Sequence, residues 1–163
     1  MNLKKVNKNK GLVLRNSRGF TLIEILVVIG IVAILATIVL VAINPARQFE
    51  QARNAQRTSN VNAILNAIGQ NIADNKGTIP AAILVAPAKN ISDTVGKADL
   101  CDALVPKYIS ALPFDPSATV VDCTAVAYDT KYTVVKDANG RITVSAIGED
   151  PDGAGNITIS VTR

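Results

Sequence analysis

The sequence predicts an α+β protein in which one long N-terminal helix, half transmembrane and half amphipathic, packs on a small antiparallel β-sheet head. Three observations predict this fold class. An apolar run covers residues 20–43, a helical stripe follows it up to residue 74, and three alternating segments end the chain. The apolar share of 48% and the mean hydropathy of +0.28 are high for a purely soluble protein, so we expect a membrane segment.

The positive charge of the chain is concentrated before Phe20. The formal net charge is +4, yet acidic residues outnumber basic ones after residue 19. No acid accompanies the six basic residues of the first segment, which are Lys4, Lys5, Lys8, Lys10, Arg15 and Arg18. The rest of the chain has no basic stripe interleaved with aromatic residues, so we predict no specific nucleic-acid binding.

The apolar run of residues 20–43 is long enough to cross a bilayer. As a helix it would span about 36 Å, against a hydrocarbon core of about 30 Å. The basic residues before it place the N-terminus in the cytoplasm and the chain after Ile43 outside. A secretory signal peptide is the alternative, but its apolar core is shorter, and neither Ala36 nor Ala42 ends a small-residue cleavage site.

An amphipathic helix is expected over residues 44–76, after a kink or break at Asn44-Pro45. Gly77 suits a left-handed position that ends this helix. Its polar side chains off the apolar stripe include Arg53, Arg57, Asn62 and Asn66. The stripe that should dock on the head consists of Val61, Ile64, Leu65, Ile68 and Ile72.

The head should occupy residues 77–163. Residues 78–116 are rich in Ala and Pro and predict an irregular connection with a short helix near residues 97–104. Alternating segments at 132–136, 141–147 and 157–162 predict strands of one antiparallel sheet. The sequence Asp-Ala-Asn-Gly at 137–140 predicts a hairpin turn in which Asn139 and Gly140 adopt positive φ.

The two cysteines, Cys101 and Cys123, lie in the part of the chain predicted to be outside the membrane. A thiol pair in such a location favours a disulfide, and a pair of buried free thiols is the alternative. Closing a loop of this length would stabilise the head by about 3 kcal/mol.

Composition argues against catalysis and against a resident cofactor. Histidine is absent, which excludes His-based acid/base chemistry and His-ligated metals, and the head has no Gly-x-Ser-x-Gly motif. An acidic turn at 149–156 offers Asp150, Asp152 and Asn156 as candidate Ca²⁺ ligands, but a polar turn between strands explains it equally well. Because the 12-residue calcium loop is absent, we predict no metal. Because the head has no catalytic motif, we predict no enzyme activity.

The stretch RGFTLIE at residues 18–24, followed by the apolar run, resembles the class III signal of the type IV prepilin family. The resemblance implies a pilin-like fold and a basic leader over residues 1–19. It further implies that a prepilin peptidase/N-methyltransferase cleaves between Gly19 and Phe20 and methylates the new N-terminus at Phe20.

Glu24 is the one ionisable residue inside the apolar run, where its charge costs about 3 kcal/mol. Cleavage would create a cationic amino group at Phe20. The resemblance implies that Glu24 pairs with the Phe20 amino group of a neighbouring subunit and so promotes assembly. A hydrated position at the headgroup level is the alternative.

The resemblance implies a structural subunit of a type IV pilus or related filament that serves adhesion, motility, DNA uptake or secretion. Its partners would be copies of itself, other pilins, the peptidase, the inner-membrane assembly platform and membrane lipid. It would be a single-pass cytoplasmic membrane protein with its head outside, and then part of an extracellular pilus or an envelope-spanning pseudopilus.

The sequence LPFDP at 112–116 is similar to a turn of the type II secretion pseudopilins, although the Trp-Gly that commonly follows is here Ser117-Ala118. Major pilins, minor pilins and pseudopilins all fit these residues. A second hypothesis is a membrane-anchored extracytoplasmic module that binds a ligand or ion, and it predicts indifference to replacement of Glu24.

Overall fold

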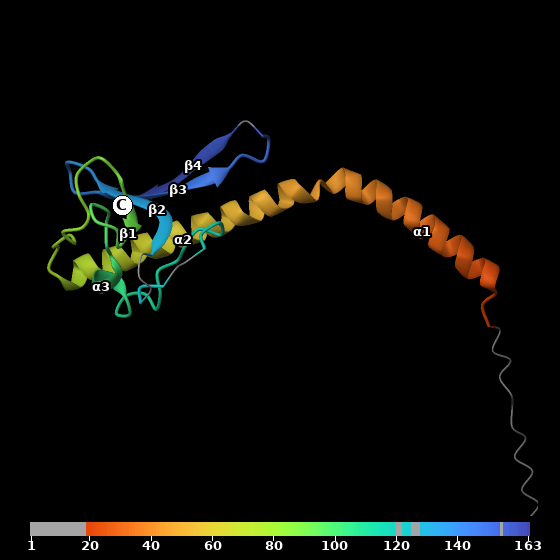
Figure 1. Ribbon diagram of the computed structural model, residues 1–163, viewed down its shortest axis with the longest axis horizontal. Coiled ribbons are helices and arrows are strands. Elements are labelled where there is room, and N and C mark those ends of the chain that lie inside the picture. The colour runs from red at the N-terminus through yellow and green to blue at the C-terminus, as the bar shows by residue number, and fades with distance from the viewer. Residues whose placement is uncertain (1–18, 120–121, 125–127, 154) are drawn as a thin grey trace, which may run out of the picture. The chain divides into compact units, whose positions relative to one another are not determined.

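The computed structural model describes residues 19–119, 122–124, 128–153 and 155–163. The predicted leader, except Gly19, lies outside the described residues. The chain forms two compact units, one ending at Ile43 and the other beginning at Asn44. The elements are α1 (Leu22–Ile43), α2 (Pro45–Asp74), β1 (Lys89–Ser92), α3 (Cys101–Leu104), β2 (Asp129–Lys136), β3 (Ile142–Glu149) and β4 (Asn156–Thr162) (Figure 1). The predicted α+β fold class is confirmed.

Helix α1 forms where the sequence is almost continuously apolar. None of its 22 residues is buried, and its Leu, Ile and Val side chains are each at least 50% exposed. By length and composition it can cross a membrane, since 22 helical residues span about 33 Å. The predicted helix of membrane-spanning length is therefore present.

The predicted interruption at Asn44-Pro45 is also present. Asn44 adopts a left-handed conformation with φ of 47°, which asparagine tolerates better than most residues. Its side-chain oxygen accepts a hydrogen bond from the Arg47 N–H at 3.5 Å and caps α2. Pro45 occupies the first turn, where its missing N–H leaves no hydrogen bond unmade.

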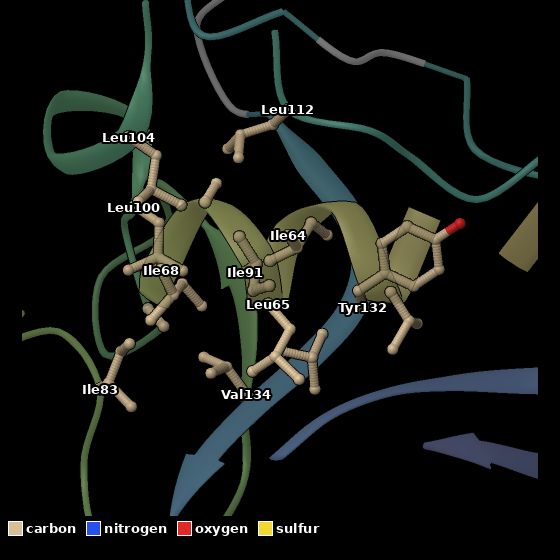
Figure 2. Close-up of a cluster of buried hydrophobic side chains, with 14 of the residues drawn as sticks. Ile64, Leu65, Ile68, Ile83, Ile91, Leu100, Leu104, Leu112, Tyr132 and Val134 are labelled. Atoms are coloured by element: carbon tan, nitrogen blue, oxygen red, sulfur yellow. The ribbon is translucent and has the colours of Figure 1, made fainter. Parts of the chain in front are cut away.

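The predicted stripe of α2 faces the core of the head. Val61, Ile64, Leu65 and Ile68 are buried, and Ile72 packs half-buried against them. Figure 2 shows Ile64, Leu65 and Ile68 of the stripe together with side chains of the connection, of β1 and of β2, namely Ile83, Ile91, Leu100, Leu104, Leu112, Tyr132 and Val134. Arg57 lies off this stripe, as predicted, but it is also buried, because it pairs with Asp115 across the head.

Two successive residues in left-handed conformations end α2. Lys76 has φ of 56° and Gly77 has φ of 86°. The Gly77 N–H donates to the Ile72 carbonyl at 2.8 Å, which satisfies a carbonyl of the last turn. The predicted role of Gly77 is confirmed, but a lysine precedes it in the same conformation.

The sheet is antiparallel with strand order β1-β2-β3-β4, and α2 lies along one face of it (Figure 1). Strands β2, β3 and β4 confirm the three predicted segments. Strands β2 and β4 begin earlier than predicted, and β3 begins one residue later and ends two residues later. Strand β1 was missed, because its sequence Lys-Asn-Ile-Ser carries little β propensity and forms a strand only by pairing with β2.

The hairpin turn between β2 and β3 differs from the prediction in one residue. Gly140 has φ of 83°, but Asn139 is not in the left-handed region. The Asp137 carboxylate accepts from the N–H groups of Asn139 (2.9 Å) and Arg141 (2.8 Å), so this side chain organises the turn. The predicted short helix is also smaller than expected and consists of the four residues of α3.

Strands β2 and β3 separate part of the way along their length. Their pairing runs from Lys136–Ile142 to Thr133–Ser145, after which β2 stays with β1 and β3 stays with β4. The segment around Asp115 approaches β2 here, because its N–H donates to the Thr130 carbonyl at 3.0 Å. The sheet therefore has a gap beside the first half of α2.

The Cys101–Cys123 disulfide is present, with a Cα–Cα distance of 5.7 Å. It ties the N-terminus of α3 to the chain that leads into β2. The disulfide prediction is confirmed, and the alternative of two free thiols is wrong.

Candidate assembly site and polar clamp

Gly19 and Phe20 precede the first turn of α1 and are both exposed. Neither residue is helical, so the peptide bond between them lies in extended chain immediately before the helix.

Glu24 and Thr21 form a reciprocal capping box at the start of α1. The Thr21 hydroxyl accepts from the Glu24 N–H at 3.2 Å. Glu24 Oε2 in turn accepts from the Thr21 N–H and from its hydroxyl, each at 2.8 Å. This is the Thr-x-x-Glu pattern, which satisfies two N–H groups that a helix start leaves unpaired. The pattern was readable in the sequence, but our sequence analysis missed it.

The capping box changes the account of Glu24. Its carboxylate lies at the positive end of the helix dipole and already has partners inside its own chain. Only Oε2 is engaged, whereas Oε1 accepts no hydrogen bond from the described residues. One oxygen can therefore hold the cap while the other accepts from an external donor such as an amino group.

A second polar cluster, the polar clamp, joins α2 to the end of β3 and consists of Arg53, Asn54, Arg57, Asp115 and Glu149. Arg57 Nε donates to Asp115 Oδ2 at 2.7 Å, and its Nη2 donates to Asp115 Oδ1 at 3.1 Å and to Glu149 Oε1 at 2.9 Å. Arg53 pairs with Glu149 from one turn earlier on α2. Two arginines of one helix thus hold carboxylates from two distant segments.

Asn54 completes the polar clamp through the backbone of β3. Its side-chain oxygen accepts from the Glu149 N–H at 2.9 Å, and its side-chain amide donates to the Glu149 carbonyl at 2.5 Å. Both backbone groups of a strand-end residue are thereby paired by one side chain, as a neighbouring strand would pair them. The polar clamp fixes the end of β3 against α2.

The charges of the polar clamp persist through the neutral pH range. Hydrogen bonds from Arg53 and Arg57 lower the pKa of Glu149 to about 2. Burial alone would raise the pKa of Asp115, but hydrogen bonds from Arg57 and Ser117 outweigh burial and hold that pKa below its ordinary value. The hydrogen bonds from Arg57 to Asp115 raise the pKa of the guanidinium in return.

Of the candidate calcium ligands, Asp150 and Asp152 lie in the turn between β3 and β4, and Asn156 is the first residue of β4. Asp152 Oδ1 pairs with Arg47 of α2 at 2.8 Å, and Asp150 Oδ1 accepts from the Asp152 N–H at 2.9 Å. Within the described part of the chain, which omits Ala154 of this turn, no three carboxylates or thiols converge as a metal-ligand set. The contacts seen for both acids are those of a turn docked on α2.

Comparison with known proteins identifies the N-terminal segment. Residues 14–40 match the family model described as "Prokaryotic N-terminal methylation motif". No curated protein and no solved structure shows a significant match to the chain. The matched range includes Gly19, Phe20, the capping box and most of α1. The N-terminal part of this chain is therefore the class III prepilin signal found in precursors of type IV pilins and pseudopilins.

Proposed function

We propose that the chain is the precursor of a structural subunit of a type IV pilus or related filament, cleaved after Gly19 and polymerised through α1. One observation carries the proposal. Helix α1 is apolar apart from Glu24 and Thr37, has no buried residue and begins inside the methylation motif. Such a surface is stable only against lipid or against other apolar helices.

Assembly in a membrane needs more than apolar contact, because lipid tails solvate leucine as well as a neighbouring helix does. A charge at the membrane edge supplies the missing preference. The ionised Glu24 is costly there, and the amino group that cleavage creates at Phe20 is cationic at neutral pH. Pairing Glu24 Oε1 of one subunit with that amino group of the next would relieve both costs while Oε2 keeps the cap.

The proposed partners follow from this route. A prepilin peptidase/N-methyltransferase would cleave and methylate the chain, and a membrane assembly platform would add it to other pilins. The basic leader and the apolar α1 support an orientation with the head outside the cytoplasmic membrane. Adhesion, motility, DNA uptake and secretion are all roles that such a filament serves.

The capping box allows a discriminating test at Glu24. Glu24→Gln keeps an acceptor for the Thr21 N–H but loses the charge, whereas Glu24→Ala loses both. We expect both variants to be processed, because the change lies beyond the cleaved bond. We also expect both to form far fewer filaments than the natural protein, counted by electron microscopy of sheared preparations.

Intact mass of the membrane fraction supplies the control. A chain that begins at Phe20 and is about 14 Da heavier reports cleavage and methylation independently of assembly. Normal filament numbers for Glu24→Gln, together with normal processing, would refute the pairing. A chain that retains Met1 in native membranes would refute the proposed function itself.

A membrane-anchored binding module is the second candidate function. A cavity of about 360 Å³ in the head, lined in part by Arg57, Asp115 and Glu149, favours it. That function needs α1 only as an anchor. Glu24→Leu would then leave the ligand affinity and the amount of protein in the membrane unchanged. Filament loss in this variant distinguishes the first function from the second.

A further inference from the structure

The head contains a half-enclosed cavity of about 360 Å³ in the gap where β2 and β3 separate. Its volume falls in the range of small-molecule sites. Arg57, Asp115 and Glu149 of the polar clamp form one wall. The other lining residues on which the argument depends are Asn90, Lys131, Thr133, Ile147 and Asn156.

Lys131 has an unusual backbone for a strand residue. Its φ is 65°, in the left-handed region that lysine rarely occupies. The Asp129 carboxylate accepts from the Lys131 N–H at 2.8 Å and holds this conformation. Backbone strain of this kind concentrates at functional sites. Here it lies in β2 at the point where the pairing with β3 is lost, and the residue lines the cavity.

The charges around the cavity leave one cation unmatched. Asp115 accepts from Arg57 and Ser117, and Glu149 accepts from Arg53 and Arg57, so the charges of the two carboxylates are balanced by the two arginines. The exposed Lys131 ammonium forms no ion pair with the described residues. The cavity therefore has a net preference for an anion.

The remaining polar groups of the cavity can form hydrogen bonds with hydroxyl groups of a ligand. The side-chain amides of Asn90 and Asn156 make no hydrogen bond within the described chain, and each can both donate and accept. Thr133 adds a hydroxyl. Ile147 is 63% exposed and supplies an apolar surface beside these groups.

We propose that this cavity binds a small hydroxylated carboxylate of the sugar-acid class. The Lys131 ammonium holds the carboxylate, the amides of Asn90 and Asn156 bind hydroxyl groups, and Ile147 contacts the C–H face of the ring. This site lies in the head and does not depend on the proposed filament function. It would give an exposed subunit a means of contacting acidic saccharides.

The test uses the full chain in detergent micelles and D-glucuronate as the probe. We expect the backbone amide signals of Lys131, Ile147 and Asn156 to shift on titration and to saturate at millimolar glucuronate, and glucose to produce no shift. Lys131→Gln should weaken the affinity at least tenfold. Lys136→Gln, on the same strand but outside the cavity lining, is the matched control and should bind normally.

Lys131→Gly separates a binding role from a structural one. Glycine adopts positive φ without strain, so this variant should unfold at a higher urea concentration than the natural protein while losing glucuronate binding. Absence of shifts at saturating glucuronate would overturn the proposal. Equal responses to acetate and glucuronate would also overturn it, because they would show a simple anion site. Undiminished glucuronate binding by Lys131→Gln would overturn it as well.

Discussion

Replacing Arg57 by methionine would leave a buried carboxylate without its cation. The side chains of Arg57 and Asp115 are only 3% and 5% exposed, so water cannot replace the lost partner. Breaking a buried pair by removing one partner costs about 3–5 kcal/mol. Native domains are stable by about 5–15 kcal/mol, so the head would lose a large share of its stability.

The contacts of Asp115 place the expected loss at the lower end of that range. Without Arg57, its Oδ1 still accepts from the Ser117 N–H at 2.8 Å and the Ser117 hydroxyl at 2.6 Å. Methionine is unbranched and fills much of the vacated volume, which keeps the cavity contribution small. We therefore expect a loss of about 3 kcal/mol in the free energy of unfolding.

Urea unfolding of the full chain in a mild detergent measures this loss. The sequence has no tryptophan, so the near-UV circular dichroism of the buried Tyr128 and Tyr132 reports on the head. Arg53→Met is the matched control, because its pair with Glu149 is partly exposed (38% and 32%) and should cost less than about 1 kcal/mol. Equal losses for Arg57→Met and Arg53→Met would refute the reasoning.

Two further predictions concern the same end of the head. The pKa of Glu149 is about 2 in the folded head against an ordinary 4.5, and the pKa of Asp115 is also lowered. The stability that these two carboxylates contribute is therefore complete above pH 4.5 and is lost as the pH falls toward 2. The urea midpoint should fall over this window and fall less for Glu149→Gln, and a constant midpoint in the natural protein would contradict the ion pairing. Gly148→Ala should cost about 1–3 kcal/mol, because the new Cβ would lie 2.8 Å from Ile157 Cγ1 and 3.0 Å from Asn54 Oδ1. Gly69→Ala, on the exposed side of α2 with no atom within 4 Å, should instead raise the urea midpoint, and shifts of the same sign in both variants would show that Gly148 is not crowded.

The parts of the fold that follow from local patterns were predictable from the sequence. The continuous apolar run predicted α1, the helical stripe predicted the buried face of α2, and the alternating segments predicted β2 to β4. Asn44-Pro45 marked the helix break because the missing proline N–H acts on the chain locally. Each of these signals lies within a few residues of the structure that it determines.

The parts that depend on distant partners were not predictable. Arg57 lies 58 residues before Asp115 in the sequence, and no local feature distinguishes it from a solvated arginine. Strand β1 likewise exists only through its pairing with β2. Glu24 was a different case, because its cap was readable from Thr21 three residues before it, while its role in assembly rests on resemblance alone.

The composition of α2 explains why polar contacts, rather than apolar ones, hold the end of β3 against the first half of this helix. Between Pro45 and Asn60 the only large apolar side chain is Phe49, and it is 65% exposed. This half of the helix has no apolar stripe on which the sheet could dock, so the end of β3 is held by arginines and an asparagine instead. The half from Val61 onward packs through aliphatic contacts, which do not titrate. Acid should therefore loosen the head first at the polar clamp, the end nearer in sequence to α1, while the aliphatic core stays packed.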